Sequence, residues 1–374
     1  MSPRTKPPFR ADHVGSLLRP AELRRARDDH QAGHITAEQL QAAEDEAIRK
    51  AVKLQEDAGL QGITDGEMRR SSWHMDFFYQ IPGVTKSGER INVPFRGRGA
   101  GVAFTADAIA LSGKVMLDRT IFGDAFTFLK SVATQTPKLT IPSPSVLHGT
   151  MTRVAGPAGY SHIYPQQEEL LHDVAQVYRD ELARLAQLGC TYLQLDDTTF
   201  ATICDPAGRA AYAKGSDDAD RRHLTYINLV NDSLKERPAG MAVCVHTCRG
   251  NYRSSWFASG AYDFVAEPLF SQLDVDGFFL EYDDARSGGF EPLRFVPKGK
   301  MAVLGLITSK RPELESKDTL KRRIDEAAKY IPLDQICLSP QCGFSSTHEG
   351  NALTEEQQIA KLRLVVETAR EVWG

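Results

Sequence analysis

The stretch VCVHTCRGN, residues 243–251, places three side chains that bind soft metal ions at alternate positions: Cys244, His246 and Cys248. Zinc in proteins takes histidine nitrogen and cysteine sulfur in tetrahedral sets. Alternate residues of an extended strand point to the same side, so His246 and Cys248 are expected to face one common site. A His-x-Cys pair alone also fits a buried core, because cysteine is among the most buried residue types. Further ligands must therefore come from elsewhere in the chain.

Polar or metal-capable residues stand at the end of every strand that the sequence predicts. They include Glu281 after the sixth strand and Cys342 after the eighth. In a barrel of parallel strands the carboxyl ends meet on one face, where catalytic residues lie. His246, Cys248, Glu281 and Cys342 therefore converge if the chain forms such a barrel. Their wide separation differs from zinc-finger spacing and requires a site assembled by tertiary structure.

Short β-branched runs alternate with helical patterns along the chain. The helical patterns, with apolar residues three or four positions apart, cover 35–59, 168–189, 317–331 and 354–373. Thr36 with Gln39 fits a capping box, and Thr354 opens the last helix with a similar cap. No glycine-rich dinucleotide fingerprint follows a strand, which disfavours an open doubly wound sheet. The alternation predicts a (β/α)8 TIM barrel. Its eight strands are expected near residues 12–15, 61–65, 139–142, 191–196, 241–246, 277–282, 301–307 and 336–340.

The region 69–135 is too long for one barrel helix, and we interpret it as an insertion after the second strand. Within it, residues 91–115 alternate and carry glycine turns, which indicates a β-hairpin. We interpret residues 1–374 as a single barrel catalytic domain that includes this insertion. His74, which follows Trp73, fits either a substrate contact or a packed residue of the insertion, and packing is the favoured interpretation.

The composition is that of an ordinary globular enzyme. The 374 residues are 41% hydrophobic and 25% charged, so the core can form without a metal or disulfides. A net charge of −4 gives no general attraction to nucleic acid or anionic membranes. The start of the chain lacks the apolar stretch of a secretory signal, and we expect a cytoplasmic protein. The six scattered cysteines are therefore expected to be core residues, ligands or nucleophiles and not disulfides.

Six motifs resemble the cobalamin-independent methionine synthase family, in particular short single-barrel proteins similar to its C-terminal catalytic half. The resemblance covers nearly the whole chain. It implies a catalytic zinc, bound by the His-x-Cys pair, a strand-end glutamate and a late cysteine, which here are His246, Cys248, Glu281 and Cys342. The motifs are RADHVGSLLRP near the start, ITDGE at 63–67, LQLDD at 193–197, HTC at 246–248, FLEYDDARSG at 279–288 and LSPQCGF at 338–344.

The resemblance also implies a site for homocysteine. The family glutamate and aspartate that hold the substrate amino group match Glu67 and Asp196, and the serine near the substrate carboxylate matches Ser16. This is chemically sensible, because an ammonium group pairs with carboxylates and a carboxylate accepts hydroxyl and N–H groups. Structural salt bridges or caps are the alternative roles of these residues. Asp197 and His13 lie beside them in sequence and could orient ligands.

The implied ligand set favours one kind of zinc chemistry. A free thiol is mostly protonated at neutral pH, and binding to Zn²⁺ removes that proton. Two thiolates and a carboxylate place three negative charges around the ion, which leaves a bound substrate sulfur electron-rich. Such a centre favours alkyl transfer to sulfur over activation of water, for which histidine-rich ligand sets are more usual. We expect Glu281, a harder ligand than thiolate, to loosen when the substrate sulfur binds.

The resemblance breaks after the seventh strand. Family members carry a histidine there that acts as general acid toward the leaving folate, whereas Lys310 takes that place here. Lysine donates a proton or binds an anion, but its pKa lies far above neutrality unless perturbed, and a solvated loop lysine fits equally well. The N-terminal half of the long family members, which helps to bind folate, has no counterpart in this sequence. Both departures leave the methyl donor open.

Three functions follow from these observations. The leading one is zinc-dependent methyl transfer to the homocysteine thiol, which gives methionine, with methyltetrahydrofolate or another methyl donor. The second resembles epoxyalkane–coenzyme M transferase, whose sulfonate-bearing thiol would pair with cations. The third is a zinc-stabilised binding or storage protein without enzymatic activity. The oligomeric state stays open, and candidate partners of a sulfonate are Arg19, Arg69, Arg70 and Lys310.

Overall fold

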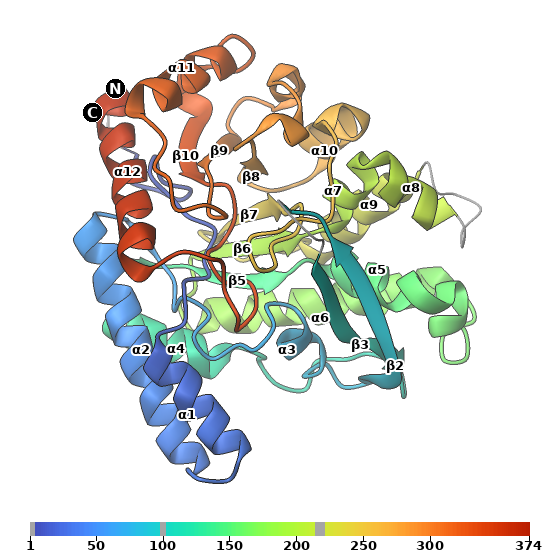
Figure 1. Ribbon diagram of the computed structural model, residues 1–374. Helices are drawn as coiled ribbons and strands as arrows, with labels where there is room; N and C mark the ends of the chain where they lie inside the picture. Colours follow the sequence, from blue (N-terminus) through green and yellow to red (C-terminus); the bar gives the residue numbers. More distant parts are fainter. Residues whose placement is uncertain (1–3, 98–101, 214–220) are drawn as a thin grey trace.

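The computed structural model describes residues 4–97, 102–213 and 221–374, so residues 98–101, within the predicted hairpin, lie outside the described ranges. Six parallel strands form one sheet in the order β10-β9-β8-β7-β6-β5. Figure 1 shows these strands around the centre of the molecule. Their bounds are Leu139–Pro142 (β5), Tyr192–Asp197 (β6), Ala242–Thr247 (β7), Gly277–Glu281 (β8), Met301–Ile307 (β9) and Ile336–Pro340 (β10).

Two further segments close the sheet into a ring. β4 (Thr136–Pro137), just before β5, pairs in parallel with β1 (Gly62–Ile63). The segment at Ala11 forms a parallel bridge with Leu338 of β10. Next to β1, the Thr64 hydroxyl donates to the carbonyl of Gly15 over 2.6 Å. The predicted (β/α)8 barrel is therefore confirmed.

Helices cover the outside of this ring (Figure 1). The capping boxes at Thr36 and Thr354 are present, with Gln39 and Gln357 as their partners. The helix predicted over 317–331 ends earlier, at Ala327, because Pro332 keeps the preceding residues from continuing the helix. The helices are α1 (Ala21–Gln31), α2 (Ala37–Ala58), α3 (Met75–Phe78), α4 (Gly123–Val132), α5 (Pro144–Ala155), α6 (Gln167–Gln187), α7 (Thr199–Cys204), α8 (Pro206–Ala213), α9 (Arg222–Ser233), α10 (Ala266–Gln272), α11 (Lys317–Ala327) and α12 (Glu355–Trp373).

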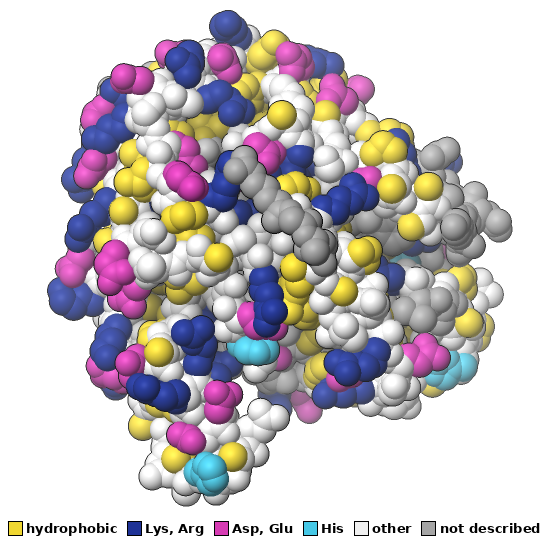
Figure 2. Space-filling view, in the orientation of Figure 1, with side chains coloured by type: hydrophobic (Ala, Val, Ile, Leu, Met, Phe, Trp, Pro, Cys, Tyr) yellow, Lys and Arg dark blue, Asp and Glu magenta, His cyan; other side chains and the backbone are white. Residues whose placement is uncertain are grey.

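The surface agrees with the charge balance of the sequence. Lys and Arg side chains alternate with Asp and Glu around the periphery of the face shown in Figure 2. Among the described residues, no helix combines the length and the apolar character needed to cross a membrane. All six cysteines fall within the described ranges, and each is buried and free, as predicted.

The region 69–135 contains the predicted hairpin. β2 (Val84–Phe95) pairs antiparallel with β3 (Val102–Leu111), and the pairing starts at Val84, earlier than the predicted 91. The extra length includes a register shift between Lys86 and Arg90. α4 follows the hairpin and leads into β4, which is the place of a barrel helix. The interpretation of 69–135 as an insertion within one domain stays a prediction.

A buried polar cluster holds the first barrel segment in place. The ammonium group of Lys138, between β4 and β5, lies 3.0 Å from Asp12 and 4.1 Å from the centre of the Phe279 ring. The Tyr192 hydroxyl donates to the other oxygen of Asp12 over 2.7 Å. His13 contacts the carbonyl of Gly62 at 3.1 Å, and burial and the Lys138 charge lower its pKa to about 4. His13 therefore supports the barrel ring, from which the chain continues to Ser16.

Candidate metal centre and substrate cavity

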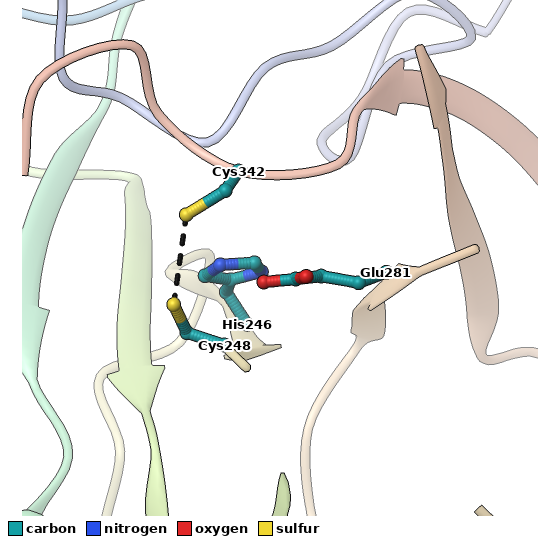
Figure 3. A group of neighbouring side chains, drawn as sticks. All are labelled: His246, Cys248, Glu281 and Cys342. Carbon is teal, nitrogen blue, oxygen red and sulfur yellow. Dashed lines mark hydrogen bonds between the residues drawn. The ribbon is translucent and has the colours of Figure 1, made fainter. Parts of the chain in front are cut away.

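Four side chains from separate strand ends meet at the carboxyl face of the barrel. His246 is the next-to-last residue of β7 and Cys248 follows that strand, Glu281 ends β8, and Cys342 follows β10. One potential ligand atom from each lies within 4.8 Å of all the others, and all four residues are buried. Figure 3 shows the four side chains pointing toward one another. A nitrogen, two sulfurs and a carboxylate oxygen at this spacing match the donor types and number of a zinc site.

His246 presents one ring nitrogen to this cluster. Its Nδ1 lies 3.3 Å from the carbonyl oxygen of Phe279 on β8, so a proton on Nδ1 is donated to that carbonyl. Its Nε2 is buried and has no hydrogen-bond partner among the described residues. Metal-bound histidines commonly donate the second ring N–H to a carbonyl in this way. The orphaned Nε2 is therefore free to bind a metal ion.

The two cysteines lie close enough to share a proton. Their sulfur atoms are 3.5 Å apart, joined by the dashed line in Figure 3. The hydrogen bond from Cys248 holds the pKa of the Cys342 thiol well below its usual value. The same bond raises the pKa of Cys248. The backbone N–H of Gly250 donates to the Cys248 sulfur over 3.3 Å. Of the two cysteines, Cys342 is therefore the one that favours the thiolate.

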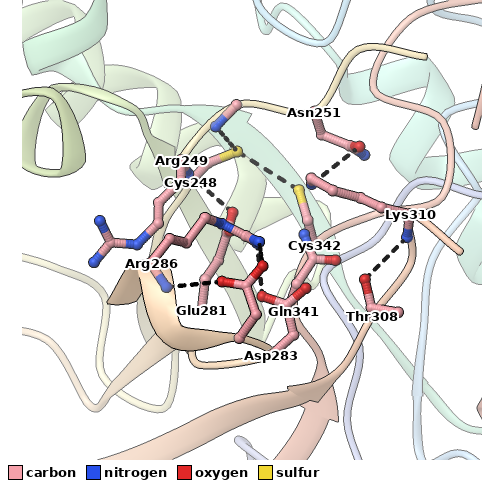
Figure 4. A network of polar contacts seen from close by, with 12 residues as sticks. Cys248, Arg249, Asn251, Glu281, Asp283, Arg286, Thr308, Lys310, Gln341 and Cys342 are labelled. Carbon is pink, nitrogen blue, oxygen red and sulfur yellow. Dashed lines mark hydrogen bonds and ion pairs between the residues drawn. The ribbon is translucent and has the colours of Figure 1, made fainter. Parts of the chain in front are cut away.

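The two carboxylate oxygens of Glu281 accept hydrogen bonds from two different donors. Its Oε1 accepts the backbone N–H of Arg249 over 2.9 Å, and its Oε2 lies 3.3 Å from the guanidinium of Arg286. Arg286 also pairs with Asp283 at 2.6 Å and with Asp284. Figure 4 shows this network beside the two cysteines. Glu281 is thus a ligand that already has competing partners.

A cavity opens on one side of the cluster. It encloses about 950 Å³, counting the space open to solvent. The same cavity is lined by Ser16, Glu67, Asp196, His246, Cys248 and Cys342. The structure therefore brings all three predicted substrate contacts and three of the four predicted ligands to one space.

Glu67 lines this cavity and carries one carboxylate oxygen without a hydrogen-bond partner among the described residues. Its Oε1 accepts the Thr140 hydroxyl over 3.0 Å and pairs with Arg70 at 3.4 Å. Its Oε2 is buried and has no hydrogen-bond partner in the described parts of the chain. Glu67 has a φ of 58°, a strained conformation for a residue with a side chain. Burial raises the pKa of Glu67, against the opposing charges of Arg70 and Arg19.

Asp196 is the second carboxylate of the cavity. Its Oδ1 accepts the side-chain amide of Gln194 over 2.7 Å, and burial raises its pKa to about 7. A cation placed between the two carboxylates would lower both pKa values and neutralise the buried charge. The side chain of Asp197, by contrast, is not part of the described lining of the cavity. Its carboxylate accepts the N–H groups of Thr199 and Phe200, while its backbone carbonyl accepts the N–H of Cys248 over 2.6 Å.

Ser16 lines the cavity, and its hydroxyl lies close to the backbone of Gly343. Its hydroxyl accepts the backbone N–H of Ser345 over 3.3 Å. A Cβ atom on Gly343 would lie only 2.0 Å from the Ser16 hydroxyl oxygen. Gly343, next to Cys342, therefore lets the serine approach the loop that carries a candidate ligand.

Aromatic side chains form the outer wall of the cavity. The hairpin contributes Phe95 and Phe104, whose rings lie 5.5 Å and 5.2 Å from that of Tyr252. His74 also lines the cavity, and its ring stacks on Trp73 at 4.4 Å. Burial, with the nearby Arg153, lowers the pKa of His74 to about 3, so this ring is neutral. His74 is thus both packed and at the wall.

Lys310 lies at the edge of the site. Its ammonium group donates to the side-chain oxygen of Asn251 over 3.3 Å, and only 5% of the residue is exposed (Figure 4). It is therefore not a solvated loop lysine. Asn251 lines the cavity, whereas Lys310 is absent from the described lining. The predicted catalytic role of Lys310 stays a prediction.

Several residues of the site were missed in the sequence. Arg286 stands inside the FLEYDDARSG motif and Asn251 inside the turn after the HTC motif, so both positions carried a signal. Nothing in the sequence marked Arg153 or the aromatic residues Phe95, Phe104 and Tyr252 as part of the site. They belong to α5, the hairpin and a loop, which only the fold brings together.

Comparisons with known proteins agree on one family. The family model described as "Cobalamin-independent synthase, Catalytic domain" matches residues 146–371, more than half of the chain. The uncharacterized protein YxjH of Bacillus subtilis is 46% identical over 371 residues, which cover 98% of this chain and 96% of that protein. A methionine synthase of Sulfurisphaera tokodaii is 26% identical over 333 residues, covering 88% of this chain and 84% of that enzyme.

Solved structures give the same result. A Listeria monocytogenes protein, solved as a candidate vitamin-B12 independent methionine synthase, matches with a TM-score of 0.76 and 34% identity. The match covers 99% of this chain and all of that one. A B12-independent methionine synthase from Shewanella sp. W3-18-1 shares the fold, with a TM-score of 0.72, 20% identity and 96% coverage of both chains. The chain belongs to the cobalamin-independent methionine synthase family.

Proposed function

We propose that this protein is a zinc-dependent methyltransferase that methylates the thiol of homocysteine to give methionine. Membership of the family supports methyl transfer to homocysteine in general. The observation that carries the specific proposal is the unpaired, buried Oε2 of Glu67, in the cavity that also holds Asp196 and two candidate zinc ligands, Cys248 and Cys342. Carboxylates and a thiol-binding metal in one cavity suit a molecule that carries both an ammonium group and a thiol.

His246, Cys248, Glu281 and Cys342 would hold the zinc ion, which when bound would keep the substrate thiol deprotonated at neutral pH. Glu281 is the ligand we expect to yield its place to the substrate sulfur, because Arg249 N–H and Arg286 already bind its two oxygens.

The remaining residues position the amino acid. Glu67 and Asp196 bind the ammonium group, and the Ser16 hydroxyl donates to the carboxylate. The sulfur then forms a bond to the methyl carbon, while the donor atom keeps the electron pair of the broken bond and takes up a proton. Lys310, through its contact with Asn251 at the cavity edge, is the group we assign to supply positive charge or that proton.

The coenzyme M alternative requires cations around the thiol's sulfonate. Arg19, Arg69, Arg70 and Lys310 were the expected partners, and none of them belongs to the described lining of the cavity. Arg19 donates to the carbonyls of Leu17 and Ser345, while Arg69 pairs with Glu44 and Asp45. The arginine that does line the cavity is Arg153. Because the described lining sets two carboxylates, Glu67 and Asp196, against this arginine, the homocysteine proposal is favoured over the sulfonate proposal.

Calorimetric titration of the zinc-loaded protein with three thiols tests the proposal. Homocysteine should bind at least about a hundredfold tighter than 4-mercaptobutyrate, which lacks only the amino group, because buried carboxylates left unpaired reject the analogue. Coenzyme M serves as the third ligand. Equal affinity for homocysteine and 4-mercaptobutyrate, or tighter binding of coenzyme M, would overturn the proposal. Zinc that responds to no thiol would support a binding or storage protein.

A further inference from the structure

Arg286 is a buried cation shared by three carboxylates beside the candidate metal centre (Figure 4). Its Nη2 atom lies 2.6 Å from Asp283 and 3.3 Å from Glu281, and its Nη1 atom pairs with Asp284. The Arg286 side chain is only 7% exposed. Arg286 and Glu281 are both absent from the described lining of the cavity, so Arg286 contacts a candidate metal ligand and not the substrate space. Any effect of Arg286 on substrate binding is therefore expected to act through Glu281.

One nitrogen of Arg286 serves two competing carboxylates. Charge-assisted N–H···O bonds usually measure ~2.7–2.9 Å, so the pair with Asp283 is close and the pair with Glu281, at 3.3 Å, is loose. The loose pair can shorten when the Glu281 carboxylate leaves a metal ion. While Glu281 binds that ion, Arg286 keeps Asp283 and Asp284 as partners. Neither arrangement leaves a buried charge unpaired, which would be strongly destabilising. The network therefore offers Glu281 two paired positions.

The guanidinium of Arg286 is held in place from its other side. It lies 5.0 Å from the centre of the Trp256 ring, within the range of a cation–π interaction. Trp256 in turn exchanges two backbone hydrogen bonds, of 2.5 Å and 2.8 Å, with Arg96 after β2 of the hairpin. The backbone N–H of Arg286 also donates to the Asp284 carboxylate over 2.9 Å. Arg286 is therefore a fixed cation, and the Glu281 carboxylate is the partner that moves.

We propose that Arg286 is a positioning residue that receives the Glu281 carboxylate when the substrate sulfur takes its place on the metal. This inference rests on the proposed methyltransferase function and adds the residue that governs the exchange of ligands. The carboxylate keeps its charge and its electron pairs, and the thiol proton leaves to the buffer. Competition between the metal ion and Arg286 for one carboxylate then sets how firmly zinc is held and how readily a thiol enters.

Two variants of this network should have opposite effects on zinc. Arg286→Gln removes the competitor of the metal, so the Kd for zinc should fall about fivefold and the Kd for homocysteine should rise about fivefold. Asp284→Asn keeps an oxygen to accept the N–H of Arg286 but removes a carboxylate that competes for its guanidinium. Arg286 then pairs more strongly with Glu281, so the Kd for zinc should rise about threefold. General damage to the site would weaken zinc binding in both variants.

Arg237→Gln is the matched control. Arg237 is also largely buried and pairs with a carboxylate, Asp276, at 2.9 Å. Asp276 precedes β8, whereas Glu281 ends it, so the control removes an ion pair at the opposite end of the same strand. We expect no change in the Kd for zinc or homocysteine. Circular dichroism checks the fold of each variant, and Asp284→Asn, at a side chain that is 34% exposed, carries the test if Arg286→Gln does not fold.

Two measurements follow the metal without any assay of activity. The Kd for zinc is obtained by competition with a chelator of known affinity, in the absence of thiol. X-ray absorption at the zinc edge then follows the addition of homocysteine, which in Arg286→Gln should leave the oxygen neighbour of zinc in place, unlike in wild type. Weaker or unchanged zinc binding in Arg286→Gln, or loss of the oxygen neighbour as in wild type, would overturn the inference and leave the proposed function intact. If Arg286→Gln does not fold, unchanged or tighter zinc binding in Asp284→Asn would overturn it. A wild-type protein in which homocysteine adds no sulfur to zinc would overturn the proposed function itself.

Discussion

Replacing Glu67 by glutamine tests the substrate assignment at a single atom. The substitution keeps the size of the side chain and the contact with Thr140, which is 3.0 Å from Oε1. It removes the negative charge of the buried Oε2, which has no partner in the described structure. The homocysteine ammonium is then left with Asp196 alone. Hydrogen bonds to charged groups contribute ~1.5–3 kcal/mol, so the affinity for homocysteine should fall roughly 10- to 150-fold.

The assay is calorimetric titration of zinc-loaded wild type and Glu67→Gln with homocysteine and with 4-mercaptobutyrate. The loss should appear for homocysteine only, because the analogue has no ammonium group, and the zinc content should be unchanged. Glu44→Gln is the matched control, since Glu44, like Glu67, forms ion pairs with arginine, at 3.3 Å and 3.2 Å, but lies outside the described lining of the cavity. An affinity for homocysteine within twofold of wild type, or an equal loss for both thiols, would refute the reasoning.

Three further predictions concern the metal, Ser16 and the buried His148. Cys342→Ala should lose zinc and thiol binding while circular dichroism shows an intact barrel; retained stoichiometric zinc would contradict the ligand assignment. Gly343→Ala should displace the Ser16 hydroxyl, which a Cβ would approach to 2.0 Å, and raise the KM for homocysteine about tenfold with zinc retained; an unchanged KM would show that Ser16 does not bind substrate. Burial, with the charge of Arg222, lowers the pKa of His148 to about 3, so the folded state binds fewer protons than the unfolded state between pH 6.5 and 3. The contribution of His148 to stability is therefore complete above pH 6.5 and falls by ~1.4 kcal/mol per pH unit as the pH drops from about 6 to 4. Urea unfolding of wild type and His148→Asn should show a difference in stability that changes by this amount over that range, and a constant difference would mean that the fold does not lower the pKa of His148.

Periodicity predicted the barrel because each strand and helix is short and locally regular. Seven of the eight predicted strands overlap observed strands, whereas the first, near 12–15, forms only an isolated bridge at Ala11. The capping boxes at Thr36 and Thr354 form as their spacing implies. The boundary of α11 was less predictable. Leu320 and Ile324 keep the apolar spacing, but the chain turns after Ala327 ahead of Pro332.

The site could be predicted only where residue type and strand end coincide. His246, Glu281 and Cys342 combine metal-binding chemistry with a position at the end of a strand, and the structure brings them together. Asp197 shows the limit of this reasoning. Its side chain was expected to orient ligands, but its backbone carbonyl holds the N–H of Cys248 instead, and no residue type predicts a backbone contact.

Positions that depend on the insertion were beyond sequence reasoning. Phe95 and Phe104 pack against Tyr252 in the cavity wall only because the hairpin folds over the barrel face. Arg153 reaches the cavity wall from the last turn of α5, where nothing in the local sequence marks a binding residue. Lys310 was placed at the site by alignment, and the structure locates it behind Asn251.

X-ray absorption at the zinc edge tests the central claim most directly. The protein is measured with zinc bound, first alone and then with homocysteine. With Cys248 and Cys342 as ligands, we predict two sulfur neighbours at about 2.3 Å in the free protein and three after homocysteine is added. The third sulfur should replace an oxygen neighbour, from Glu281. Bound zinc whose sulfur neighbours do not increase with homocysteine would contradict the account of a thiol-activating metal centre.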